Sequence, residues 1–245
     1  MKIMRGLWCG LLVLALGSGC IKLNQTVEIK PDGSGVLNMT YGMSEQTIAQ
    51  MESMKAMGGE MAEGDEDDGN PFDFDEEKLR AAFAEKGLEG VELLDVKSSV
   101  KEGWKYMTVR LAFENLAALG KTDFFEDNGL SLAKTEAGNY VLTQASADES
   151  AGEQEEMDMD DPAMQAMMQQ MAPMFAGMRI EMTIKTPGKV ISSNATEQGE
   201  DQVRWVYDVD ADPSVISKMQ KLSLRVEFDG TGLDLEPFTA PPSGD

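Results

Sequence analysis

The stretch KLNQTVEIKPDGSGVLNMTYGM, residues 22–43, contains two strand-like runs on either side of a turn sequence. Leu23, Val27 and Ile29 follow, imperfectly, the period of two that is typical of a half-buried strand. The tripeptide Pro31-Asp32-Gly33 favours a tight turn, because proline fixes one backbone angle and glycine tolerates a positive φ. The chain then returns through residues 36–42. The stretch therefore predicts a β-hairpin.

Similar patterns recur along the chain. Residues 91–100 and 104–114 predict a second hairpin around Lys101-Glu102-Gly103. In its second arm, polar residues alternate with a set that we expect to face the core, namely Met107, Val109, Leu111 and Phe113. A third hairpin is expected from 130–132 and 140–142. Further strands are expected at 179–185, 190–194, 203–209 and 222–228.

Short helices are expected between the hairpins. Ser44 and Asp75 are suitable N-caps, and Gly87 is a suitable end for the helix that begins after Asp75. Asp161 followed by Pro162 favours the start of a methionine-rich helix. The resulting prediction is an α+β fold, in which antiparallel β-hairpins form a sheet with a few short helices and acidic disordered loops.

Two acidic segments interrupt these elements, at 60–77 and 145–161. Such segments have too few apolar groups to offset the entropy lost on ordering. We therefore expect one domain over 20–230, with acidic and Met-rich insertions near 58–74 and 145–178. The Pro-rich residues 231–245 are expected to form a flexible tail.

The N-terminus predicts export. Lys2 and Arg5 precede an apolar run at 6–16, and small residues then lead to Cys20. This order is typical of a signal peptide, here residues 1–19. Cys20 in this place resembles the acylated cysteine of a bacterial lipobox, which carries a diacylglyceryl group and palmitate. The alternatives are an ordinary secretory signal and, because the run is short, less favourably a retained membrane anchor.

Composition excludes several classes of function. The net charge is −23, with 44 acidic and 21 basic residues, so binding to nucleic acid is not expected and anionic membranes should repel the chain as a whole. The sequence contains no histidine, which removes the commonest general base and transition-metal ligand. We expect no cofactor and no catalysis.

Two stretches resemble one family. They are CIKLNQTVEIKPDGSGVLNMTYGMS at the start and MRIEMTIKTPGKVISSNATEQGEDQVRWVYDV near the end. Together they resemble the LppM-like bacterial lipoproteins. The matching residues form a hairpin turn, a corner and a tryptophan-bearing strand: Pro31, Asp32, Gly33, Pro187, Gly188 and Trp205. The resemblance implies an α+β envelope domain suspected of contacting lipid or glycolipid, without catalytic residues.

These observations favour a non-enzymatic envelope protein that is anchored at Cys20 and binds a lipid, an apolar ligand or a partner protein. Because Ile21 is not the aspartate that retains lipoproteins at the inner membrane of enteric bacteria, the outer membrane is favoured. The first alternative is periplasmic copper binding, since thioethers select Cu(I). Its candidate ligands are Met51, Met54, Met57, Met164, Met167, Met168 and Met171.

Other chemistry has weaker support. Asp208, Asp210 and Asp212 alternate as calcium ligands do, but Pro213 occupies the place of the loop glycine in an EF-hand. Ser98 and Lys101 match a Ser-x-x-Lys pattern without its companion motifs, so an enzyme of unknown chemistry is the last alternative. Trp104 and Trp205 are candidates for sugar stacking, although core packing is the simpler interpretation.

Replacing the cysteine tests the anchor. Cys20→Ala should abolish acylation and leave an unprocessed precursor, because the thiol is the attachment point. Intact mass and membrane fractionation of the expressed protein measure this. A processed protein of normal mass, still membrane-bound in the variant, would contradict the lipoprotein prediction.

Overall fold

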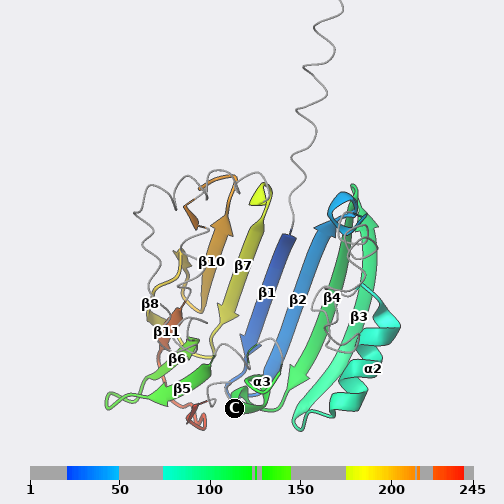
Figure 1. Ribbon diagram of the computed structural model, residues 1–245. Coiled ribbons are helices and arrows are strands. Elements are labelled where there is room, and N and C mark those ends of the chain that lie inside the picture. Colours follow the sequence, from blue (N-terminus) through cyan, green and yellow to red (C-terminus); the bar gives the residue numbers. More distant parts are fainter. Residues whose placement is uncertain are drawn as a thin grey trace, which may run out of the picture.

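In the part of the chain that the structure describes, twelve strands in two sheets make up about half of the residues (Figure 1). This computed structural model describes residues 21–49, 74–122, 125, 129–144, 175–212, 214–215 and 223–239. The strand order of the large sheet is β3-β4-β2-β1-β7-β10-β9, and that of the small sheet is β12-β5-β6-β11-β8.

The large sheet consists of β1 (Ile21–Ile29), β2 (Gly35–Ser44), β3 (Val91–Lys101), β4 (Trp104–Phe113), β7 (Arg179–Lys185), β9 (Glu197–Gln198) and β10 (Gln202–Asp208). The small sheet consists of β5 (Leu130–Lys134), β6 (Tyr140–Gln144), β8 (Val190–Ser193), β11 (Leu224–Phe228) and β12 (Phe238–Thr239). The labelled helices are α2 (Glu76–Lys86) and α3 (Leu116–Leu119).

The first hairpin is confirmed. Strands β1 and β2 pair from Ile21 opposite Met43 to Ile29 opposite Gly35. In the turn, Asp32 Oδ1 accepts hydrogen bonds from the Ser34 hydroxyl at 2.8 Å and from its backbone N–H at 3.0 Å. These bonds hold the pKa of Asp32 below its usual range. The turn is therefore fixed by the local sequence.

The predicted caps are also present. Thr47 N–H donates to Ser44 Oγ at 3.1 Å, and residues 45–49 are helical. Asp75 accepts from the first backbone N–H groups of α2, and Gly87 ends this helix in the left-handed conformation. The second and third predicted hairpins correspond to β3–β4 and β5–β6.

The prediction of one α+β sheet built of hairpins was only partly right. The fold is mostly β, with two sheets and a few short helices. Strand β1 pairs with β7 in parallel, from Lys22 opposite Arg179 to Glu28 opposite Lys185. Alternation along a strand indicates which face is buried but not which distant strand it meets, so this pairing was not predictable from the local pattern.

The core lies between the sheets. The inward residues of β1, β2 and β4 form one apolar cluster with the inward residues of β5, β6 and β11. Side chains of α2, Leu79 and Phe83, pack against the same cluster. The small sheet and α2 thus cover different parts of the large sheet (Figure 1).

Residues 231–239, the described part of the segment that the sequence predicted to be a flexible tail, are packed against the rest of the fold. Leu235 is only 4% exposed, and its backbone carbonyl and N–H both bond the buried hydroxyl of Tyr140. Strand β12 then pairs with β5, with Phe238 opposite Leu132. Buried apolar contacts and hydrogen bonds therefore hold residues that composition alone classed as tail.

Gly35 offers a test of the packing between β1, β2 and β4. A Cβ atom at Gly35 would lie 2.1 Å from the Glu28 carbonyl oxygen and 2.3 Å from Phe113 Cζ. We expect Gly35→Ala to lower the free energy of unfolding by about 1–3 kcal/mol, because the backbone of β1 must shift. Urea denaturation measures the change. The matched control is Gly199→Ala, whose Cβ would come no closer than 3.3 Å to Gln202; equal stability of the two variants would contradict this account.

Candidate functional site

A small apolar cavity lies between the two sheets. Its volume is about 20 Å³, which is room for roughly one water molecule. Large-sheet strands β1 and β7 form one wall, while α3 and small-sheet strands β5, β6 and β11 form the other. The lining residues are Gln25, Val27, Leu116, Leu119, Phe125, Leu130, Leu142, Thr143, Gln144, Met182, Thr183, Ile184 and Leu224.

Gln25 is the unusual member of this lining. It occupies an inward position of β1 and is 6% exposed, and its side-chain Nε2 has no hydrogen-bond partner among the residues that the structure describes. Its neighbours on the adjacent strands are Met39 and Met182, whose thioethers are weak acceptors. Leaving a buried donor unpaired costs about 1–3 kcal/mol. The amide group is therefore an unmet hydrogen-bond donor at an apolar cavity.

The sequence contained a signal for Gln25. Leu23, Val27 and Ile29 point inward along β1, and Gln25 is the single polar residue that interrupts this series. This interruption is why the alternation along β1 is imperfect. A polar residue in such a series could also belong to a strand at the edge of a sheet, or could be buried with a hydrogen-bond partner. Only the packing distinguishes these cases.

A larger groove lies at the end of the large sheet that carries the β1–β2 turn. Its volume is about 570 Å³. The carboxylates that line it outnumber the one lysine, Lys121; they are Asp32, Glu89, Glu114, Asp234 and Glu236. This groove is polar and acidic, in contrast to the apolar cavity between the sheets.

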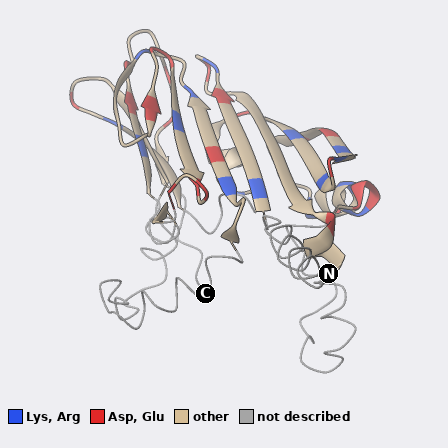
Figure 2. Cartoon of the chain, turned by 90° about the horizontal axis from the view of Figure 1, so that it is seen from above, with Lys and Arg blue, Asp and Glu red and all other residues tan. Residues whose placement is uncertain are grey.

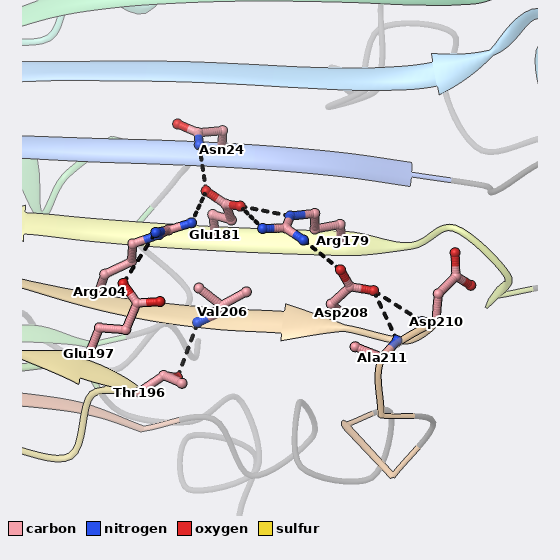
Figure 3. Close-up of polar contacts among 10 residues, drawn as sticks. All are labelled: Asn24, Arg179, Glu181, Thr196, Glu197, Arg204, Val206, Asp208, Asp210 and Ala211. Carbon is pink, nitrogen blue, oxygen red and sulfur yellow. Dashed lines mark hydrogen bonds and ion pairs between the residues drawn. The ribbon is translucent and has the colours of Figure 1, made fainter.

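A network of charged residues crosses β1, β7 and β10 on the outer face of the large sheet (Figure 3). The Arg179 guanidinium bonds Glu181 and, at 2.5 Å, Asp208. Glu181 also accepts from Arg204 at 3.1 Å and from the Asn24 amide at 3.2 Å. Because both arginines are paired with carboxylates, the network joins strands and does not offer a free site for an anion.

The network changes the ionisation of its carboxylates. Burial acts to raise the pKa of Glu181, but hydrogen bonds from Arg179 and Arg204 outweigh it, so the pKa lies below its usual range. The pKa of Asp208 is also lowered, because backbone N–H groups and Arg179 outweigh the effect of burial. Both groups are therefore held in the charged form.

Comparison with known proteins identifies the family. The sequence profile of the LppM domain matches residues 22–219. The chain belongs to the LppM domain family. The resemblance drawn from the two ends of the sequence is thereby confirmed. Membership supports a lipoprotein associated with the cell envelope.

One solved structure similar to this LppM domain is the NMR structure of the folded domain of LppM from Mycobacterium tuberculosis. The two chains are 13% identical, the alignment covers 89% of this chain and 95% of that chain, and the TM-score is 0.42. A comparison with curated proteins finds no match.

The motif residues of the LppM domain do not form one site. Pro31, Asp32 and Gly33 form the β1–β2 turn, and Pro187 and Gly188 follow β7. Trp205 is 1% exposed in the core and donates its indole N–H to Asn194 Oδ1 at 3.1 Å, so it is not available for sugar stacking. These residues shape the fold.

The other sequence-based candidates are partly outside the described residues. Cys20 and the seven methionines of the copper hypothesis lie outside them, so the anchor and the copper site stay predictions. Asp208, Asp210 and Asp212 each accept hydrogen bonds from backbone N–H groups, and within the described ranges no cluster of metal-ligating carboxylates, cysteines or histidines occurs. None of the described helices is long and apolar enough to cross a membrane.

The Glu181 network generates a prediction about acid stability. A carboxylate whose pKa is lowered in the folded state contributes stability above its unfolded pKa, and this stability is lost as the pH falls through the folded value. Glu181→Gln should lower the free energy of unfolding by about 1–2 kcal/mol near pH 7. It should also flatten the loss of stability between about pH 5 and pH 3.

Urea titrations at several pH values measure both effects. The control is Glu136→Gln, the same substitution at an exposed turn residue. If both variants keep the slope of stability against pH that the unmodified protein shows, the network does not contribute in this way.

Proposed function

We propose that this LppM domain protein is anchored to the cell envelope through a lipid at Cys20 and binds an amphiphile between its two sheets without catalysing a reaction. The single observation that carries the ligand proposal is the unpartnered Nε2 of Gln25, buried at the apolar cavity. The expected ligand has an apolar chain and an oxygen atom that accepts this hydrogen bond.

The lining of the cavity supports this choice of ligand. Val27, Leu142, Ile184 and Leu224 provide a wall that gains free energy by covering hydrocarbon rather than water. A ligand carbonyl or hydroxyl oxygen at Gln25 would remove the cost of the unpaired amide. An apolar wall with a few polar groups, here Gln25 and Gln144 with Thr143 and Thr183, is the usual composition of a small-molecule site.

The small size of the cavity means that a ligand can bind only if the protein changes its conformation. At about 20 Å³ it is too small for a lipid chain, so binding requires the sheets to separate or the side chains between them to repack. Met182 lines the cavity, and an unbranched thioether side chain adapts to such changes at low cost. The competing interpretation is one water molecule held by Gln25 and Gln144.

The absence of catalysis is supported by the available groups. The chain has no histidine, and the one described pairing of the Ser-x-x-Lys serine is with Glu76, which accepts from Ser98 Oγ at 2.8 Å. Hydrogen bonds from Ser98 lower the pKa of Glu76. A carboxylate with a lowered pKa is a poor general base, which supports the proposal that this pair does not activate a nucleophile.

The experiment is a fluorescence titration with parinaric acid, a fluorescent fatty acid, on the Cys20→Ser chain without its signal peptide. Gln25→Leu should weaken binding about tenfold, since one hydrogen bond in a buried site is lost. The same substitution should raise thermal stability, because it removes the unpaired amide. Gln202→Leu, at an exposed position of β10, is the matched control and should change neither quantity.

Two results would overturn the ligand proposal. One is the absence of saturable binding to the unmodified domain, which would leave a single water as the occupant of the cavity. The other is equal affinity in the Gln25→Leu and Gln202→Leu variants, which would place the bound probe elsewhere.

A further inference from the structure

The end of the large sheet at which β1 begins gathers the termini of β1, β2, β3 and β4, next to the start of β7 and the end of β10. Register places Ile21 opposite Met43, Ser44 opposite Trp104, and Trp104 opposite Lys101. The start of β1, the end of β2, the start of β4 and the end of β3 therefore share one edge of the molecule (Figure 1). Cys20 immediately precedes Ile21, so a lipid on Cys20 would attach at this edge.

Two aromatic rings lie on the outer face of the sheet at this edge. Trp104 and Tyr106 are stacked, with ring centroids 6.3 Å apart and planes 23° from parallel. Lys22 Nζ lies 4.0 Å from the centroid of the Trp104 ring, which is a cation–π distance. The three side chains form one contiguous group over β1, β2 and β4.

Gly42 makes this arrangement possible. It lies between Lys22 on β1 and Tyr106 on β4 in the register of the sheet. A Cβ atom at Gly42 would lie 2.5 Å from Tyr106 Cδ1, so the ring occupies the space that a side chain would need. The aromatic rings are thus supported by the sheet, and both side chains are partly exposed.

Basic and apolar residues complete the edge. Lys101 and Lys105 flank the β3–β4 turn, and Val100, opposite Lys105, is 61% exposed. The described carboxylates of this turn region are Glu45 and Glu102. Register puts Lys22, Lys101, Trp104 and Tyr106 on the outer face of the sheet, whereas Val100 and Lys105 lie on the inner face, where Lys105 Nζ is 5.4 Å from the centroid of the Phe74 ring. We define the anchor-end patch as the residues of both faces that meet at this edge: Lys22, Val100, Lys101, Trp104, Lys105 and Tyr106. Its positive charge contrasts with the net charge of −23 of the chain, and Figure 2 shows basic residues at the ends of neighbouring strands.

We propose that the anchor-end patch lies against the surface of an anionic phospholipid bilayer, the one that holds the lipid on Cys20. Tryptophan and tyrosine favour the headgroup region, where an apolar ring and a polar group are both satisfied. Lysines interact there with lipid phosphates, and an exposed valine reaches the apolar boundary. The proposal rests on the anchor at Cys20 but not on a ligand between the sheets.

Because the lipid on Cys20 would already hold the protein at the bilayer, weak interactions of the patch are enough for it to contact the headgroups. Lys22 is two residues from Cys20, which limits their separation to roughly 7 Å along the chain. A tether of this length keeps the patch at a high effective concentration beside the headgroups. The acidic remainder of the chain, including Asp208 and Asp210 at the end of β10, is then repelled by the same surface, so that the attraction is confined to the anchor-end patch.

Tryptophan fluorescence provides a direct test on the processed, lipidated protein. Of the three tryptophans, Trp8 lies in the predicted signal peptide and Trp205 is buried, which leaves Trp104 as the reporter of the patch. The protein is reconstituted in vesicles of phosphatidylethanolamine and phosphatidylglycerol, with and without brominated acyl chains that quench tryptophan. We expect strong quenching of the unmodified protein and none of a Trp104→Phe variant.

Charge reversal supplies matched variants. Lys22→Glu, Lys101→Glu and Lys105→Glu together should reduce quenching at least about fivefold, because the patch becomes repelled by anionic headgroups. Lys30→Glu, Lys121→Glu and Lys189→Glu change the net charge equally at exposed positions away from this edge and should leave quenching unchanged. Thermal melts establish that both triple variants are folded.

Three outcomes would overturn the proposal: no quenching of the unmodified protein, equal quenching of both triple variants, or quenching that survives Trp104→Phe. Failure of the proposed function, which is lipid anchoring at Cys20 and binding of an amphiphile between the sheets, is detected by separate measurements. Acylation is measured by intact mass and ligand binding by the parinaric acid titration, so a lipidated, ligand-binding protein without Trp104 quenching would contradict the membrane-contact proposal alone.

Discussion

Strand β1 pairs along most of its length on both sides, and this double pairing is the constraint on which the architecture depends. On one side it forms the local hairpin with β2, and on the other it pairs in parallel with β7, more than a hundred residues later. Because β7 in turn pairs with β10, β1 joins two parts of the chain that would otherwise form separate small sheets. Only a sheet of this width provides an inner face that the small sheet and α2 can share.

The parts of the fold that the sequence predicted are those with local causes. Asp32 and Gly33 fix their turn, Asp75 and Gly87 fix the ends of α2, and alternation at Met107 to Phe113 identifies the buried face of β4. The parallel pairing of β1 with β7 and the division into two sheets depend on contacts between distant segments. Leu235 shows the same limit: its burial depends on the hydroxyl of Tyr140, to which nothing in the Pro-rich terminal sequence points.

The two tryptophans of the described structure show how far pattern alone identifies a site. Both lie on alternating strands, and the sequence treats them alike. Trp205 faces the small sheet and bonds Asn194, whereas Trp104 lies on the outer face beside Tyr106 and beneath Lys22. The difference arises from register, because a shift of one residue would exchange the two faces of a strand. Gln25 is the opposite case, since a polar residue in an apolar series was visible in the sequence, while its missing partner was not.

The direct succession of Cys20 and β1 also has a mechanical consequence. Any pull on a lipid at Cys20 would act along the axis of β1, with no linker to stretch first. The hydrogen bonds to β2 and β7 run across that axis, so they would be loaded together in shear and not opened one after another. A strand held on both flanks in this way resists extraction far better than an edge strand peeled from its end. If a lipid is attached at Cys20, the load would therefore fall on a strand that is paired on both sides.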